Sequence, residues 1–286
     1  MKITKDKTVI SVYLNSDSGT VGFRQNLFLI SDLHYDSIYC DRDLFKRDFN
    51  RAKETGAFIL IAGDFFDAMQ GRRDKRGNLD ELRPEYKKDN YFDVLVDDAY
   101  EFLKPYQENI ILFGYGNHET SVIRHTQTDL ISRLVGALNS GKDYKIQTGG
   151  YGGWVRFMFS RKKPCGSVAY RYHHGKGGSA FVSDGIMDDK RAGVSIPDAD
   201  LVHFGHNHKE YVHTVARERL NGKGVIIHDK QLYVRTPGYK NAYIKDEQGL
   251  SWDYSMGGSP TPLGGVTVTL GMKDDRPAVL GYTKDF

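Results

Sequence analysis

Short groups of acidic, amide and imidazole side chains follow several apolar runs of this sequence. The first is Asp32-Leu33-His34, which comes directly after the run NLFLIS. Similar groups follow later runs: GDFFD (63–67), GNHE (116–119), HHG (173–175) and GHNH (205–208). Nitrogen and oxygen donors without thiolate suit borderline divalent ions such as Mn, Fe, Zn or Co. Side chains at positions i and i+2 of an extended segment point the same way, so Asp32 and His34 can face one metal ion.

Each group taken alone also has an ordinary structural explanation. DLH can be a turn or a helix cap, GDFFD a turn followed by a cap, and GNHE a tight turn with its Asn in a left-handed conformation. A tyrosine-rich strand that ends in two histidines can simply bury one of them with its hydrogen bonds satisfied. The two imidazoles of GHNH are more suggestive, because they repel each other if both are charged. All five groups in this order, each at a strand end, favour one shared site.

The first half of the sequence predicts a scaffold that brings these groups together. Strand-like runs at 26–31, 57–63 and 109–114 alternate with helix-period segments at 41–55, 91–103 and 126–138. Near-continuous apolar strands such as FILIAG suit a sheet that is covered on both faces. In strand–helix sheets, ligands bind beyond the carboxyl ends of the strands. We therefore predict an α/β fold in which the five groups converge at one edge.

The later part of the sequence is richer in strands. Strand-like runs occur at 154–160, 167–173, 199–205, 210–216, 224–228, 231–236 and 264–270, and one more lies near the N-terminus at 8–14. The late runs alternate more strongly between apolar and polar residues. This alternation predicts a sheet with one wetter face.

The composition is that of an ordinary globular protein. The chain has 286 residues, a formal net charge of +3, 39% hydrophobic residues and 27% charged residues. This small charge excess does not by itself predict nucleic-acid binding. Two cysteines, Cys40 and Cys165, without a CxxC pattern argue against a disulfide framework and a cysteine zinc site. We expect a cytoplasmic protein without a membrane span, because no run approaches ~18 apolar residues and the N-terminus lacks a secretion signal.

The ordered set of groups resembles the motifs of the calcineurin-like metallophosphoesterase superfamily. That pattern is DxH, GDxxD, GNH with a following acid, a His before Gly, and GHxH, and it spans residues 26–208 here. The segment RTPG (235–238) resembles the strand and turn that often follow the last motif. The resemblance implies an α/β fold, a four-layer α-β-β-α sandwich of two mixed sheets flanked by helices. It implies one domain over 1–286, with a charged insertion near 70–90 and a strand-rich part, 210–286, that completes the second sheet.

The resemblance also implies a role for each matched position. The expected metal ligands are Asp32, His34 and His208 for a first ion, Asn117, His174 and His206 for a second ion, and Asp64 for both. His118 would not bind metal but would act beside the phosphoryl oxygens and the leaving group, as an acid or charge stabiliser oriented by Asp67. Of the two adjacent histidines, His174 is favoured over His173 because a Gly follows it.

The activity implied is hydrolysis of a phosphate ester by water that two divalent metal ions activate. Manganese is the expected metal, with iron, zinc, cobalt and nickel as alternatives. We expect a phosphodiesterase or nuclease acting on nucleic acid, because basic residues gather within 70–88 and near His174, namely Arg161, Lys162, Lys163, Arg171 and Lys176. A solvated loop of mixed charge also explains the first cluster. The alternative activities are a phosphatase for phosphoproteins, nucleotides or small phosphomonoesters, and a scaffold that kept the fold and lost the chemistry.

Overall fold

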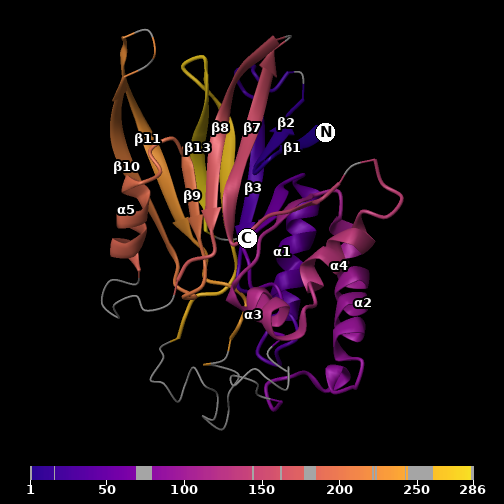
Figure 1. Ribbon diagram of the computed structural model, residues 1–286. Helices are drawn as coiled ribbons and strands as arrows, with labels where there is room; N and C mark the ends of the chain where they lie inside the picture. The colour runs from indigo at the N-terminus through magenta and orange to yellow at the C-terminus, as the bar shows by residue number, and fades with distance from the viewer. Residues whose placement is uncertain are drawn as a thin grey trace.

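Two β-sheets lie face to face in the computed structural model, and helices cover the outer face of each sheet (Figure 1). The structure describes residues 2–284 apart from 16, 69–78, 144, 162, 177–184, 221, 223, 242 and 244–259. In Figure 1, α5 (Ile186–Val194) lies outside one sheet, and α1 (Arg42–Glu54), α2 (Tyr91–Leu103) and α4 (Leu130–Leu138) lie outside the other. This arrangement is the predicted four-layer sandwich.

The six-stranded sheet carries the alternating first half of the chain. Its strands, in spatial order, are β13 (Arg276–Thr283), β12 (Val266–Lys273), β3 (Arg24–Ile30), β4 (Phe58–Ile61), β5 (Ile110–Phe113) and β6 (Gln147–Thr148). From β3 to β6 the neighbours are parallel, and β12 and β13 add to the β3 edge in antiparallel pairing. The parallel part follows the strand–helix alternation that the sequence predicts.

The seven-stranded sheet is built from the N-terminal hairpin and the strand-rich second half. Its strands, in spatial order, are β1 (Lys2–Asp6), β2 (Val9–Tyr13), β7 (Gly152–Arg161), β8 (Lys163–His173), β9 (Leu201–Phe204), β11 (Ile226–Arg235) and β10 (Tyr211–Leu220). The runs predicted at 224–228 and 231–236 form the single strand β11. Parallel pairing of β8 with β9, and of β9 with β11, aligns three strand ends at one edge.

The C-terminal strands differ from the prediction that they complete the second sheet. Strands β10 and β11 do join the seven-stranded sheet, whereas β12 and β13 join the six-stranded sheet. The reason is that β3 would otherwise present an unpaired edge, which β12 covers from Val266↔Leu29 to Gly271↔Arg24. In this position Val266, Val268 and Leu270 also face the core between the sheets.

Alternation along the strands divides the core into layers. In β3, Leu27 and Leu29 face the apolar core between the two sheets, while Phe28 and Ile30 pack with the helix side. Successive strand side chains point to opposite faces, so a strand covered on both sides is apolar throughout. A smaller cluster around Val202 packs α5 onto the outer face of the seven-stranded sheet.

Three of the helices coincide with predicted segments, and two were not predicted. Helix α1 begins after Asp41, whose side chain accepts a hydrogen bond from Leu44 N, and α4 begins in the same way after Asp129. Helices α3 (Asn117–Thr126) and α5 had no clear apolar stripe in the sequence. None of the helices in the described parts of the chain is long and apolar enough to cross a membrane.

Part of the predicted charged insertion near 70–90 lies outside the described residues, since 69–78 are not among them. The part that is described packs against the domain. Residues Pro84–Tyr86 form a short 3₁₀ turn, and Leu82 and Tyr86 are buried.

Candidate metal centre

The predicted ligands meet where strands of both sheets end. Asp32 follows β3, Asp64 follows β4, and Asn117 begins α3, which follows β5 after three residues. From the other sheet, His174 follows β8, and the GHNH segment follows β9. Two three-residue groups have ligand atoms within 4.8 Å of one another: Asp32, His34 and His208, and Asp64, His174 and His206. The structure therefore brings together residues that are up to 176 positions apart, from Asp32 to His208.

The first group is centred on one oxygen of Asp32. The Nε2 atom of His208 lies 3.6 Å from Asp32 Oδ1 and 3.3 Å from His34 Nε2. Asp32 is fully buried, and its Oδ1 has no hydrogen-bond partner among the described residues. A buried carboxylate oxygen without a partner is unfavourable, and such atoms are rare in folded proteins. Asp32 Oδ1 is thus suited to bind a ligand.

The second group is centred on His174. Its Nε2 atom lies 3.0 Å from Asp64 Oδ2, 3.0 Å from Asn117 Oδ1 and 3.3 Å from His206 Nδ1. The other ring nitrogen, Nδ1, donates a hydrogen bond to Ala62 O at 2.9 Å. A backbone carbonyl partner of this kind fixes the tautomer and turns the free nitrogen toward the site. The set contains one carboxylate, one amide and two imidazoles.

Asp64 lies between the two groups. Its Oδ1 atom accepts a hydrogen bond from His118 N at 3.0 Å, and Oδ2 faces His174. A Cβ atom on Gly116 would lie 1.9 Å from Asp64 Oδ1, so only glycine leaves room for this carboxylate. A third group of close ligand atoms, His34, Asp64 and His118, connects the first two.

Most of the predicted ligands have left-handed backbone conformations. The φ angles are 54° at Asp32, 50° at His34, 50° at Asp64, 77° at His206 and 54° at His208. Non-glycine residues rarely adopt this region, and each instance costs about 1–3 kcal/mol unless its surroundings enforce it. Backbone hydrogen bonds enforce it here, such as Asp32 N to Gly63 O at 3.0 Å. Concentration of unfavourable backbone at one place points to a functional site.

The electrostatics of the centre favour added positive charge. Burial raises the pKa of the Asp64 carboxyl, but His174 and His118 outweigh this effect and hold the pKa well below its usual value. For His174, burial lowers the pKa, and the nearby Asp64 and Asp32 more than reverse this to about 10. His206 shows the opposite balance, because burial and the neighbouring His174 lower its pKa. The carboxylates thus draw cationic charge to their position, which a divalent ion can supply.

The residues present fit a divalent metal site. The donor set of carboxylate, amide and imidazole without thiolate is one that Mn, Fe, Zn, Co and Ni accept. Asp32 Oδ1, which has no hydrogen-bond partner among the described residues, can bind such an ion. The predicted two-metal site is therefore compatible with the geometry.

Comparisons with known proteins give remote similarities. No protein-family model matches the chain, and no curated protein matches it. Among solved structures, a predicted phosphoesterase from Streptococcus pneumoniae is 13% identical, with 89% of this chain and 86% of that chain covered and a TM-score of 0.33. Vps29 complexed with zinc from Entamoeba histolytica is 10% identical, covering 90% and 98%, with a TM-score of 0.35. A metallophosphoesterase from Sphaerobacter thermophilus is 12% identical, covering 91% and 90%, with a TM-score of 0.29.

The resemblance to the calcineurin-like metallophosphoesterases therefore rests on the ordered motifs of the sequence. Structural similarity at these identities and TM-scores carries no information about the activity of the chain.

Beside the two ligand groups lies His118, which is buried. Its Nδ1 atom donates to the backbone oxygen of Asp67 at 2.6 Å and lies 3.4 Å from the carboxylate Oδ1. The Asp67 carboxylate is closer to His34, at 2.7 Å from Nδ1. Asp67 therefore contacts both histidines, with its carbonyl on His118 and its carboxylate on His34. The ring of His118 also lies near Asp64, with Nε2 3.8 Å from Asp64 Oδ2.

The structure places the two adjacent histidines differently. His174 is fully buried and points into the centre, with Tyr151 packed edge-on against its ring at 5.4 Å. His173 points away, accepts a hydrogen bond from Gly175 N at 3.0 Å and lies near Phe204. Neighbouring residues of a strand point to opposite faces, so this difference in orientation is the expected one.

Two buried acids that the sequence analysis did not assign shape the loops of the centre. Glu119 accepts hydrogen bonds from Gly116 N at 2.8 Å, Asp64 N at 3.1 Å and Phe66 N at 3.1 Å. Asp36 accepts from Asp67 N at 2.7 Å and from Ala68 N at 3.0 Å. The signal for Glu119 was present in the GNHE motif, whereas nothing in the sequence singles out Asp36.

Several basic residues invoked for nucleic acid do not lie at the centre. Arg161 pairs with Lys163 at the far end of the β7–β8 hairpin, while Gly152 and His173 pair at the near end. Nine residues of extended strand span about 30 Å, so Arg161 is remote. Arg83 donates to the carbonyls of Ser37 and Cys40. The residues 72–76 of the charged insertion lie outside the described residues.

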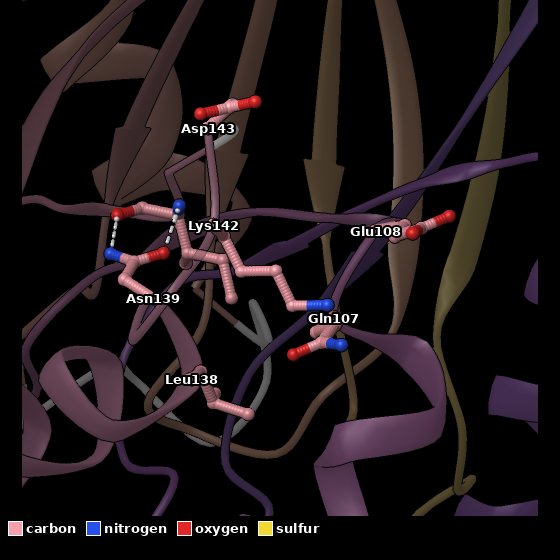
Figure 2. A pocket seen from close by; sticks show the side chains of 7 residues that line it. Gln107, Glu108, Leu138, Asn139, Lys142 and Asp143 are labelled. Atoms are coloured by element: carbon pink, nitrogen blue, oxygen red, sulfur yellow. Dashed lines mark hydrogen bonds between the residues drawn. The ribbon is translucent and has the colours of Figure 1, made fainter.

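A separate cavity of about 340 Å³ also lies away from the centre (Figure 2). Figure 2 shows its lining residues, which are Gln107, Glu108, Leu138, Asn139, Lys142, Asp143 and Ile146. They precede β5 and β6, so the cavity is at the opposite end of these strands from the ligands. Its lining includes no predicted site residue.

Proposed function

We propose that this protein is a metal-dependent phosphoric ester hydrolase. The observation that carries the proposal is the meeting of two ligand groups around Asp64, next to a buried carboxylate oxygen of Asp32 that has no hydrogen-bond partner among the described residues. In this proposal Asp32, His34 and His208 hold one ion, Asn117, His174 and His206 hold a second, and Asp64 contacts both. We also propose that residues 1–286 act as one domain, because the site takes ligands from both sheets.

A bound pair of divalent cations supplies Lewis-acid polarisation of a phosphoryl group and activation of water. The protein's own contribution is position and proton transfer. His118 donates from Nδ1 to Asp67 O, so its Nε2 is the atom that can hold a proton for a leaving oxygen. Proton transfer by a positioned side chain contributes about 10²–10⁴-fold to rate. Burial of Asp32, Asp64 and His174 keeps bulk water away from the ligand side of the centre.

Within this class we propose a phosphodiester substrate, with nucleic acid as the first candidate. A cavity of about 220 Å³ lies beside His173 and Gly175, between α5 and the outer face of the seven-stranded sheet. The support for a diester substrate is the positive charge of Arg171 and Lys176, which line this cavity together with Asp188 and Asp189 and suit an anionic chain. A phosphomonoesterase acting on phosphoproteins, nucleotides or small molecules is the alternative, and an inactive scaffold is the remote one.

Activity assays on the metal-loaded protein test the proposal. The purified chain is treated with chelator, reloaded with Mn²⁺, and given bis-p-nitrophenyl phosphate, p-nitrophenyl phosphate, and linear and circular single- and double-stranded DNA. We expect hydrolysis that needs metal and that extends to the diester. Cleavage of the monoester alone would remove the diester proposal, and a folded, metal-loaded protein that cleaves none of these substrates would contradict hydrolase activity.

A further inference from the structure

A buried chain of hydrogen bonds runs from a tyrosine of one sheet to a predicted metal ligand of the other. Tyr170 OH lies 2.8 Å from His203 Nδ1, and His203 Nε2 lies 2.9 Å from Thr236 Oγ1. Thr236 Oγ1 lies 2.6 Å from Ser31 Oγ, and Ser31 Oγ donates to Asp32 Oδ2. All five residues have 0% of their surface exposed.

These residues come from four strand regions. Tyr170 belongs to β8 and His203 to β9, and Thr236 directly follows β11 in the seven-stranded sheet. Ser31 directly follows β3 in the six-stranded sheet. The chain therefore crosses from one sheet to the other at the edge where the ligands gather.

The carboxylate at the end of the chain fixes the direction of every hydrogen bond in it. A metal-binding Asp32 is deprotonated and can only accept, so Ser31 uses its single hydroxyl proton on Asp32 Oδ2. Ser31 must then accept from Thr236, and Thr236 must accept from His203 Nε2. A neutral His203 has one N–H, so its Nδ1 accepts from Tyr170 OH. Burial lowers the pKa of His203 to about 3, which agrees with a neutral ring.

The order of these bonds leaves Asp32 with one oxygen for a ligand. Its Oδ2 accepts from Ser31 Oγ and from His206 N at 2.8 Å. Its Oδ1 has no hydrogen-bond partner among the described residues and faces His208. We propose that Ser31, Thr236 and His203 are positioning residues that hold Asp32 Oδ2 and thereby aim Oδ1 at the first metal ion. This inference rests on the proposed metal centre.

A role in packing alone does not account for these residues. The neighbouring positions on β8 and β11, Val168 and Val234, belong to the apolar core between the sheets, where aliphatic side chains would fill the space without any need for hydrogen bonds. Buried polar groups are favourable only when all of them are satisfied. Partners one step removed from a metal typically change its affinity 10–100-fold when they are mutated.

The test uses Thr236→Val, which removes the hydroxyl and keeps the shape of the side chain. Thr267→Val is the matched control, because Thr267 of β12 is also a buried threonine and its hydroxyl has no hydrogen-bond partner among the described residues. Calorimetric titration of chelator-treated proteins with Mn²⁺ measures both affinities. We expect Thr236→Val to weaken one of two binding steps 10–100-fold, Thr236→Ser to restore it, and Thr267→Val to leave both steps unchanged.

The ring protonation of His203 gives an independent test in the unmodified protein. Nitrogen-15 NMR of the metal-free chain should show His203 protonated at Nε2 and not at Nδ1. The opposite tautomer would overturn the proposal, as would equal Mn²⁺ affinities for Thr236→Val and the native chain. If Thr236→Val does not fold, Thr236→Ser and the tautomer decide. A native chain that binds no metal ion would instead overturn the proposed metal centre, and with it the proposed role of this chain of hydrogen bonds.

Discussion

At the scale of single residues, the chemistry of the centre was predictable and its conformation was not. The residue types of the DLH, GDFFD, GNHE and GHNH segments indicate a nitrogen and oxygen donor set. Only the folded chain shows the left-handed backbone at Asp32, Asp64 and His208, and the Asp32 oxygen that lacks a partner within the described parts of the chain. These features depend on contacts between segments, such as Glu119 with the backbone of Asp64, which no local pattern encodes.

Replacing His118 separates proton transfer from metal binding. We expect His118→Ala to lower turnover about 10²–10⁴-fold, because it removes the group placed to protonate the leaving oxygen, and to retain both metal ions. Elemental analysis and phosphodiesterase rates measure the two effects. His125→Ala is the control, since His125 is exposed on the same helix and bonds within it to Ser121. Loss of metal in His118→Ala would show that His118 is a ligand.

A pair of glycine substitutions tests the close approach at Asp64. Gly116→Ala would place a Cβ atom 1.9 Å from Asp64 Oδ1, so we expect lost metal affinity and a decrease of about 1–3 kcal/mol in the free energy of unfolding. Gly136→Ala in α4 meets no atom within 4 Å and should raise that free energy by about 0.5–1 kcal/mol. Denaturant unfolding and Mn²⁺ titration give both quantities. Similar behaviour of the two variants would contradict the steric account.

At the scale of elements, strong periodic patterns predicted the strands and helices that are buried on a clear face. Helix α2, with its continuous apolar stripe, was predicted with the bounds it has. Helix α3 was missed because its first residues form the GNHE motif, where the backbone hydrogen bonds of Glu119 decide the conformation. Helix α5 was missed because few of its residues are buried, although Asp189 fixes it to Arg235 of β11.

That contact gives a prediction for how α5 is attached. Asp189 and Arg235 are both buried, with Arg235 Nε donating to Asp189 Oδ2 at 2.9 Å. We expect Asp189→Ala to reduce the free energy of unfolding by about 3–5 kcal/mol, because it leaves a buried guanidinium without its counter-ion. Asp188→Ala is the neighbouring control, since Asp188 is partly exposed and pairs with Arg191 in its own helix, an interaction of less than about 0.5 kcal/mol. Equal losses measured by urea unfolding would exclude this attachment.

At the scale of the whole molecule, the sandwich was predictable from the motifs, but the allocation of late strands was not. The alternating runs near the C-terminus are equally compatible with either sheet. Pairing of β12 with β3 covers an edge of β3 that the first half of the chain leaves without a neighbouring strand. The positions of charged residues were also not predictable from the sequence. Arg161 is close to His174 in the sequence, but the long β7–β8 hairpin separates the two residues in space.

Global stability should carry a pH dependence from buried His203. Burial lowers its pKa to about 3, from an unfolded value of 6.5. Below pH 6.5 the unfolded chain binds a proton that the folded chain does not, so this contribution to stability is complete above pH 6.5 and is lost as pH falls toward 3. The loss is about 1.4 kcal/mol per pH unit, or about 2 kcal/mol between pH 6.5 and 5. Urea unfolding in the presence of chelator gives the free energy of unfolding of the native chain and of His203→Gln. The stability advantage of the native chain over the variant should shrink as pH falls, and an advantage that stays constant with pH would contradict the prediction.

Metal ions should also stabilise the whole sandwich, because their proposed ligands join its two sheets. Asp32 and Asp64 follow strands of one sheet, and His206 and His208 follow a strand of the other. Binding to the folded state alone at 100 times the dissociation constant adds about 2.7 kcal/mol, which corresponds to a rise of about 5–10 °C in Tm. Asp64→Ala should abolish this rise, since Asp64 would contact both ions, while Glu101→Ala, at an exposed acid of α2, should keep it. Thermal unfolding with Mn²⁺ and with chelator measures the shift, and an undiminished rise in Asp64→Ala would place the ions elsewhere.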